Sequence, residues 1–155
     1  MLILGIESSC DETGLALYSK DHGLIAHLVN SQIDLFTEYG GVMPEIAARD
    51  HSAKIIGILK QLLKQTDHNL EDINLIAYTA GPGLIGSLMI GETVAKTIAN
   101  VLNIELLPIN HLEGHILAPG LEEGGLEPPY LCLLVSGGHT PVSYTHLRAH
   151  ETHEH

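Results

Sequence analysis

Residues 2–14 read Leu-Ile-Leu-Gly-Ile-Glu-Ser-Ser-Cys-Asp-Glu-Thr-Gly and join a short apolar run to a turn rich in hydroxyl and carboxyl groups. A second apolar run, residues 15–18, follows the turn, and two such runs around a polar turn are typical of a β-hairpin. Residues 20–23 form another polar turn, and residues 24–29 alternate well enough to predict a third strand. The chain is therefore expected to open with three antiparallel strands.

The rest of the chain alternates between helical and strand-like patterns. Residues 31–43 are expected to form a loop. From Pro44, a residue favoured at the first position of a helix, apolar residues recur at helical spacing as far as Lys64. The elements expected after this helix are a strand at 73–79, a helix ending near Leu102, a strand at 105–109 and a short helix carrying His111 and His115.

Three strands followed by helix, strand, helix and strand is the element order of the ribonuclease-H-like lobe found in actin, sugar kinases and Hsp70. The predicted fold class is therefore α/β with an actin-like lobe, which we assign to residues 1–121. Proteins of this group have two such lobes, each opening with a strand and a phosphate-binding turn. Residues 122–141 are expected to be a connector rich in Gly, Glu and Pro, followed by the first strand, Tyr130–Val135, and first turn of a truncated second lobe.

Residues 142–155 differ in character from the rest of the chain. Four of the 11 histidines lie in the last ten residues, and the segment has neither periodicity nor turn signals. Residues 142–152, Val-Ser-Tyr-Thr-His-Leu-Arg-Ala-His-Glu-Thr, resemble the translation of a transposase adapter used in DNA library preparation. We therefore interpret residues 142–155 as a non-native tail and exclude them from the fold assignment. The alternative is a His-rich metal-binding tract.

The charge balance restricts the functions that this chain can have by itself. It has 19 acidic and 7 basic residues in 155, a formal net charge of −12, which disfavours a basic groove for nucleic acid or an anionic membrane surface. Residues 1–7 lack the basic start of a signal peptide, and no apolar run is long enough to span a bilayer. Cys10 and Cys132 have no short spacing and are expected to be reduced thiols. We expect a cytoplasmic protein without a membrane partner.

His111 and His115 are the strongest candidates for a functional site. Residues four apart on a helix lie on the same face, about 5–6 Å apart at Cβ, which is close enough to share one metal ion. The pair has three interpretations: metal ligands, a general acid and base, or the polar surface of an amphipathic helix.

Residues 81–86, Gly-Pro-Gly-Leu-Ile-Gly, match the pattern G-x-G-x-x-G between a predicted strand and a predicted helix. The pattern has two interpretations, a dinucleotide-binding loop or glycines that allow a helix to pack closely on a strand. A dinucleotide site expects an acidic residue at the carboxyl end of the next strand, whereas Glu105 lies at that strand's beginning.

Two further turns are candidates for binding phosphate. Residues 8–14 offer hydroxyl groups, backbone amides and carboxylates, although an ordinary polar hairpin would look the same. Residues 135–140, Val-Ser-Gly-Gly-His-Thr, follow an apolar strand, and adjacent glycines allow the backbone to approach an anion.

Five segments together resemble the TsaD family, also known as Gcp, and they occur in the same order from Met1 to Thr140. They are residues 5–13, 40–45, 80–84, 111–115 and 134–140. The resemblance implies a tRNA adenosine threonylcarbamoyltransferase. Such an enzyme moves threonylcarbamoyl from its adenylate to N6 of the adenosine 3′ of the anticodon, in tRNAs that read codons beginning with A.

The resemblance also implies the roles of particular residues. His111 and His115 correspond to metal ligands for iron or zinc, and Asp11 and Glu12 to acidic residues near the reacting groups. The segment that binds threonylcarbamoyl-adenylate corresponds to Leu134, Val135, Ser136, Gly137 and Gly138. The implied partners are tRNA, a smaller TsaB-like paralogue that binds this lobe, and a TsaE-like P-loop ATPase.

The resemblance further implies that residues 1–155 are the N-terminal part of a longer enzyme. Family members are more than twice this length, and their third metal ligand, an Asp, lies in the second lobe. We therefore expect residues 1–155 to be inactive alone and prone to aggregate through the strand Tyr130–Val135.

Two other functions are alternatives to the transferase. One is the metalloprotease activity once ascribed to this family, and the other is a non-catalytic, partner-binding half-lobe. A zincin requires H-E-x-x-H, whereas Glu113 lies two residues after His111, about 200° round the helix.

Overall fold

The computed structural model describes residues 1–37, 40–121, 125, 129–134, 142–144 and 147–150. The chain divides into two compact units, Met1–His111 and Leu112–His155. The first unit contains a five-stranded sheet of order β3-β2-β1-β4-β5. Its strands are β1 (Leu2–Glu7), β2 (Glu12–Ser19), β3 (Gly23–Ser31), β4 (Leu75–Gly81) and β5 (Glu105–Asn110).

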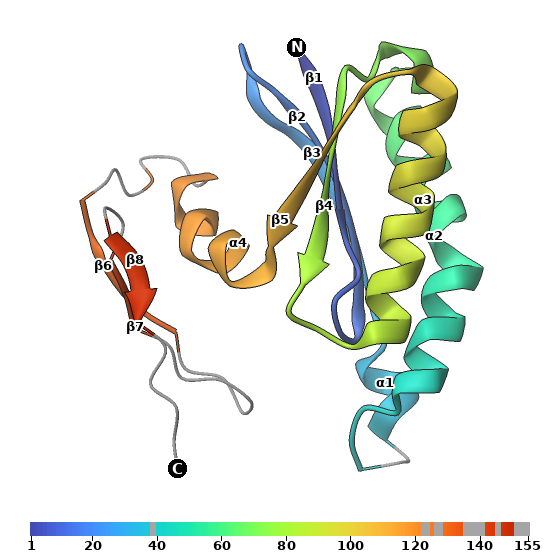
Figure 1. Ribbon diagram of the computed structural model, residues 1–155. Coiled ribbons are helices and arrows are strands. Elements are labelled where there is room, and N and C mark those ends of the chain that lie inside the picture. The colour runs from blue at the N-terminus through green and yellow to red at the C-terminus, as the bar shows by residue number, and fades with distance from the viewer. Residues whose placement is uncertain (38–39, 122–124, 126–128, 135–141, 145–146, 151–155) are drawn as a thin grey trace. The chain divides into compact units, whose positions relative to one another are not determined.

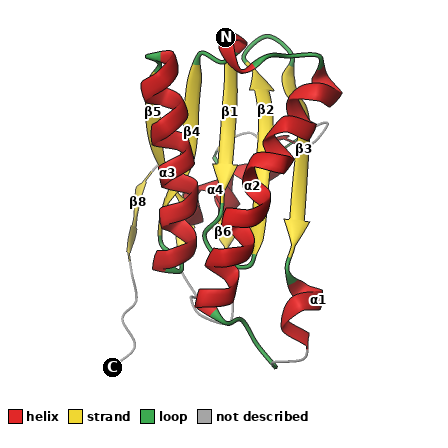
Figure 2. Cartoon of the chain, turned by 90° about the vertical axis from the view of Figure 1, so that its right-hand side faces the viewer, coloured by secondary structure: helices red, strands yellow, loops and turns green. Residues whose placement is uncertain are grey.

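Two long helices cover one face of this sheet. They are α2 (Pro44–Thr66) and α3 (Ile85–Leu102), and they lie side by side over the strands in both ribbon views (Figures 1 and 2). The short helix α1 (Ile33–Phe36) and the 3-10 turn η2 (Leu70–Asp72) lie in the connections. The part of the chain that the structure describes has no helix with the length and apolar character needed to cross a bilayer.

The core forms because β1 alternates strictly between buried and half-buried positions. Successive side chains of a strand point to opposite faces, so Leu2, Leu4 and Ile6 all point towards the helices. The helix residues packed with them are Ile55, Leu59 and Leu62 of α2 and Ala95, Ile98 and Ala99 of α3.

The strand directions place three strand ends at one edge of the sheet. β1 pairs antiparallel with β2 but parallel with β4, and β4 pairs parallel with β5. The carboxyl ends of β1, β4 and β5 therefore share an edge, next to the turn between β1 and β2. Three antiparallel strands extended by two parallel ones confirm the predicted ribonuclease-H-like, actin-like fold class.

The structure differs from the sequence-based expectation in several element bounds of the first unit. The strand expected at 73–79 is β4, Leu75–Gly81. β2 begins at Glu12 rather than near residue 15, because Glu12 and Thr13 pair with Ser31 and Asn30 of β3. The expected loop after β3 contains α1, a single helical turn that buries Phe36.

The second unit, described by itself, contains short elements. α4 (His111–Leu117) begins at the last residue of the first unit and is followed by the 3-10 turn η3 (Ala118–Leu121). A small antiparallel sheet has the order β6 (Leu131–Leu133), β7 (Val142–Tyr144) and β8 (Leu147–His150). The sequence pattern gave no element after Thr140, because three- and four-residue strands are too short to show a period. The adapter origin of this tail stays a prediction.

Candidate active site

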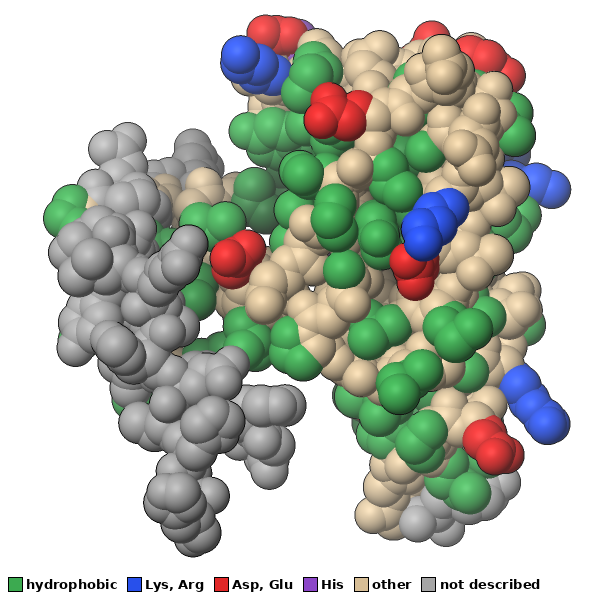
Figure 3. All heavy atoms as spheres, viewed as in Figure 1, with side chains coloured by type: hydrophobic (Ala, Val, Ile, Leu, Met, Phe, Trp, Pro, Cys, Tyr) green, Lys and Arg blue, Asp and Glu red, His purple; other side chains and the backbone are tan. Residues whose placement is uncertain are grey.

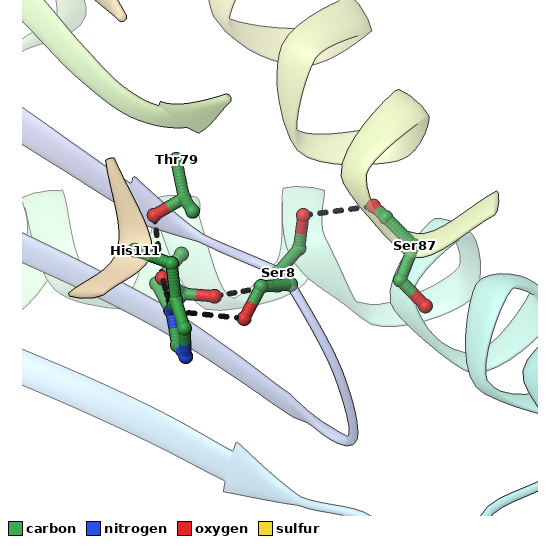
Figure 4. Close-up of polar contacts among 6 residues, drawn as sticks. Ser8, Thr79, Ser87 and His111 are labelled. Atoms are coloured by element: carbon green, nitrogen blue, oxygen red, sulfur yellow. Dashed lines mark hydrogen bonds and ion pairs between the residues drawn. The ribbon is translucent and has the colours of Figure 1, made fainter. Parts of the chain in front are cut away.

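Glu7 is the centre of a polar cluster at the carboxyl edge of the sheet. It ends β1, and its carboxylate accepts hydrogen bonds from residues on three other segments (Figure 4). The Ser9 amide donates to Oε1 at 2.5 Å, and the Thr79 hydroxyl donates to Oε2 at 2.5 Å. His111 Nδ1 lies 3.2 Å from the same Oε2. Glu7 therefore connects β1 to β4 and to the residue that follows β5.

The contacts of His111 assign the proton on its ring. A carboxylate oxygen can only accept a hydrogen bond, so Nδ1 carries the proton and donates to Glu7. Ser9 Oγ lies 3.1 Å from the same nitrogen and shares the donor. In the neutral ring, Nε2 then carries the lone pair that a metal ion requires. Metal-ligating histidines usually have this arrangement, with the other ring nitrogen bound to a carboxylate.

The environment of Glu7 favours its ionised form. Burial raises the pKa of the Glu7 carboxyl, but hydrogen bonds from Ser9, Thr79 and His111 lower it by more. The pKa therefore lies below its ordinary value, and the group accepts hydrogen bonds as a carboxylate at neutral pH.

Asp11 lies in the turn that follows Glu7, and Glu12 is the next residue along the chain. Asp11 is half-buried in the turn, and Glu12 is exposed at the first position of β2. The carboxyl edge of the sheet therefore holds Glu7, Asp11, Glu12 and His111 in one region of the first unit. The bonded cluster itself consists of Glu7, Ser9, Thr79 and His111.

The other predicted site residues belong to the second unit. His115 lies in α4, four residues after His111, and is exposed. Leu134 follows β6 and is half-buried, whereas Val135, Ser136, Gly137 and Gly138 lie outside the described residues. Within the described ranges, no three His, Cys, Asp or Glu side chains come together as a group that could hold a metal ion. Two imidazoles on one helix nevertheless have donor atoms suited to iron or zinc.

The glycine motif of residues 81–86 packs against the chain itself. A Cβ atom at Gly83 would lie 2.5 Å from the Ser9 carbonyl oxygen, and one at Gly86 would lie 3.1 Å from the Ala48 Cβ. The Leu84 amide donates to that Ser9 carbonyl at 2.7 Å. Glu105 begins β5, so it lies at the end of the sheet away from the carboxyl ends of β1, β4 and β5. These contacts favour close packing over a dinucleotide site.

Ser8 provides a second contact between the turn after β1 and the segment that contains the glycine motif. Its hydroxyl donates to the Ser87 carbonyl at 2.8 Å (Figure 4), and Ser8 is almost completely buried. The polar turn after β1 is therefore held by the start of α3.

Sequence reasoning missed the roles of Glu7, Ser9 and Thr79. Glu7 and Thr79 are separated by 72 positions and Glu7 and His111 by 104, so no local pattern relates them. The available signal was a charged residue placed directly after an apolar strand.

Comparisons with known proteins agree with this description. A family model described as TsaD, tRNA N6-adenosine threonylcarbamoyltransferase, matches residues 23–153. The structure of YeaZ from Pseudomonas aeruginosa aligns with a TM-score of 0.62 at 15% identity, covering 92% of this chain and 63% of YeaZ.

A second structure is described as an uncharacterized protein with similarity to peptidase YEAZ from Pseudomonas aeruginosa. It aligns with a TM-score of 0.58 at 18% identity and again covers 92% of this chain and 63% of its own. At these identities the likenesses show the fold, and the chain spans less than two thirds of either protein. The match over residues 23–153 means that the chain belongs to the TsaD family of tRNA N6-adenosine threonylcarbamoyltransferases.

Proposed function

We propose that this chain supplies the N-terminal lobe of an enzyme that transfers threonylcarbamoyl from threonylcarbamoyl-adenylate to tRNA. The acceptor is N6 of the adenosine 3′ of the anticodon, in tRNAs reading codons that begin with A. In this reaction a bond forms between N6 and the carbamoyl carbon, and the bond from that carbon to the adenylate phosphate oxygen breaks. Membership of the TsaD family is the observation that carries the proposal.

His111 and His115 are the proposed ligands of one divalent metal ion, iron or zinc. The Glu7 carboxylate supports this assignment because it fixes the ring of His111 through Nδ1, so that Nε2 is the ligating atom. When bound, such a metal supplies a Lewis acid that polarises the carbamoyl carbonyl. A further carboxylate ligand from a second lobe is part of the proposal.

The remaining site residues have proposed roles toward the two substrates. Asp11 and Glu12 are placed near the reacting groups, where a carboxylate can accept the proton that N6 loses. Residues 134–138 are proposed to bind the adenylate, since a Gly-Gly turn after a strand lets backbone amides approach an anion.

The proposed partners follow from the same family and from the charge. A TsaB-like paralogue is supported by the likeness of this fold to YeaZ, and a TsaE-like P-loop ATPase completes the set. A net charge of −12 repels a tRNA backbone, so basic residues of a second lobe or of these partners are proposed to hold the tRNA. The proposed location is the cytoplasm.

Metal binding tests the site directly. We would titrate Co²⁺ into the full chain by calorimetry and visible absorption, in a background where His146, His150, His153 and His155 are alanine. We expect weak binding at one site, lost in both His111→Ala and His115→Ala. His22→Ala, at an exposed turn, is the matched control and should bind like the background. Equal binding by His111→Ala would overturn the metal assignment.

Transfer activity tests the reaction. With radiolabelled threonylcarbamoyl-adenylate and tRNA, we expect no labelled tRNA from residues 1–155 alone. Labelling is expected when the chain is continued by a family second lobe and lost again on His111→Ala. Labelling by residues 1–155 alone would contradict the need for a second lobe. An extended chain that stays inactive but binds a TsaB-like protein would favour the partner-binding half-lobe.

A further inference from the structure

His51 is a buried residue of α2 whose side chain contacts the turn that follows β1. Its side chain is 0% exposed, and so is that of Thr13, the second residue of β2. His51 Nε2 lies 2.9 Å from the Cys10 carbonyl oxygen, and Nδ1 lies 2.7 Å from Thr13 Oγ1. Both ring nitrogens are therefore used within one four-residue segment of the chain.

The chemistry of these partners assigns the direction of both hydrogen bonds. A carbonyl oxygen only accepts, so His51 Nε2 carries a proton and donates to Cys10. Nδ1 of the neutral ring then accepts from the Thr13 hydroxyl. Buried polar groups are costly to leave without partners, so loss of the ring leaves Thr13 and the Cys10 carbonyl unsatisfied.

Gln32 holds the same turn at the adjacent carbonyl. Its backbone N–H donates to the Asp11 carbonyl at 3.0 Å. Its side-chain amide, in a residue that is 1% exposed, donates to the Ala47 carbonyl of α2 at 3.3 Å. Ala47 lies one helical turn before His51. The successive carbonyls of Cys10 and Asp11 are therefore tied to α2, one directly and the other through Gln32.

We propose that His51 is a positioning residue that fixes the Cys10–Thr13 segment against α2 and thereby sets where the carboxylates of Asp11 and Glu12 lie. The catalytic role of these two carboxylates rests on the proposed function. The positioning by His51 does not, because it depends on contacts inside the first unit.

Cys10 provides a native reporter of the turn. Its thiol is in the segment that His51 holds, and it is exposed. Partial loss of solvent around the Cys10 thiol raises its pKa, and the neighbouring Asp11, through its hydrogen bond and its charge, raises it further. A turn released from α2 would separate thiol and carboxylate and lower that pKa. A lower pKa makes alkylation near neutral pH faster, because the thiolate is the reactive form.

The test measures Cys10 alkylation by iodoacetamide against pH, in the full chain with Cys132→Ser. His51→Phe keeps a flat ring but removes both hydrogen bonds, and Thr13→Val removes one with little change of shape. We expect His51→Phe to lower the pKa of Cys10 and thereby to make alkylation near neutral pH about threefold faster. His51→Gln keeps a donor near Nε2 and should restore most of the original profile.

Leu59→Ala is the matched control, because Leu59 is buried in α2 but belongs to the apolar core. It should lower the urea midpoint without changing the pH profile of Cys10. If folded His51→Phe keeps the original profile, the proposal is wrong. If His51→Phe does not fold, Thr13→Val decides, and an unchanged profile there overturns the proposal. The assay needs neither metal nor tRNA. The alkylation result can therefore be interpreted even if the transferase assignment is wrong.

Discussion

Glu7 shows how one side chain can organise a site from distant parts of the chain. Its carboxylate joins Ser9, Thr79 and His111, and these contacts fix the ring on which the metal proposal depends. From the sequence, Glu7 is only the first polar residue after an apolar run. Its importance arises because parallel pairing brings the ends of β1, β4 and β5 to one edge.

Glu7→Gln is expected to weaken the pH dependence of stability. The folded-state pKa of Glu7 lies below its ordinary value, so the unfolded chain takes up this proton first as the pH falls. The stabilisation is complete above the unfolded-state pKa and is lost as the pH falls through the folded-state pKa. Urea midpoints between about pH 6 and pH 3 should fall more for the original protein than for Glu7→Gln. Parallel curves would contradict the assignment.

Glu7→Ala is expected to lower metal affinity while both imidazoles remain. Loss of a carboxylate that orients a ligating histidine typically costs about 10–100-fold in affinity. The Co²⁺ titration described above measures this effect directly. Thr79→Val removes one hydrogen bond to Glu7 but none to His111. The Co²⁺ affinity of this variant should therefore lie between those of the original protein and Glu7→Ala. Equal affinity in Glu7→Ala would show that His111 does not depend on Glu7 for its orientation.

At the scale of elements, the approach of α3 to β1 depends on a missing side chain. A Cβ atom at Gly91 of α3 would overlap the hydroxyl of Ser8, which is itself held by the Ser87 carbonyl. Gly57 in α2 has open space around it and provides the contrast. Replacing glycine by alanine should therefore have opposite effects on the free energy of unfolding at these two positions.

Gly91→Ala is expected to destabilise the protein by about 1–3 kcal/mol, because it overpacks a buried contact. Gly57→Ala should stabilise it by about 0.5–1 kcal/mol, because alanine favours helix where glycine does not. Urea unfolding measures both. Ser8→Ala removes the overlapping hydroxyl, so adding it to Gly91→Ala should recover much of the loss. A double variant no better than Gly91→Ala would indicate another source of strain.

Elements were predictable where one signal extended over many residues. Pro44 and the apolar spacing after it located α2, and the apolar run of residues 2–6 before a polar turn located β1. α1 was missed because a single turn has no period, and its burial of Phe36 is a tertiary effect. In the site, His111 and His115 could be proposed from spacing and resemblance. The cluster around Glu7 and the contacts of His51 needed the fold.

At the scale of the molecule, many large apolar side chains are exposed on the surface of a chain whose net charge is −12. Figure 3 shows apolar groups over much of the visible face of the first unit, with few charged side chains among them. Two apolar residues of α3, Ile85 and Val101, are 78% and 75% exposed. In the second unit, Leu131 and Leu133 of β6 are 68% and 65% exposed on an edge strand.

Self-association through β6 is expected, because an exposed apolar edge strand can pair with another chain. Leu131→Thr with Leu133→Thr keeps strand-forming residues but removes the apolar surface. We expect this variant to scatter less light at a given concentration, with an unchanged melting temperature of the first unit. Val101→Thr removes a similar exposed group from α3 and is the control. An equal gain from Val101→Thr would show that association is not specific to β6.

The position of β1 in the sheet has a consequence for the order of folding during synthesis. β1 is the central strand but comes first in the chain, and its Leu2 amide is bound by Asn74, 72 positions later. The β1-β2-β3 hairpins can form early, because closing short loops costs little entropy. One side of β1 then stays unpaired until the ribosome has made β4. The nascent chain therefore passes through a period in which the strand that becomes the centre of the sheet is an open edge.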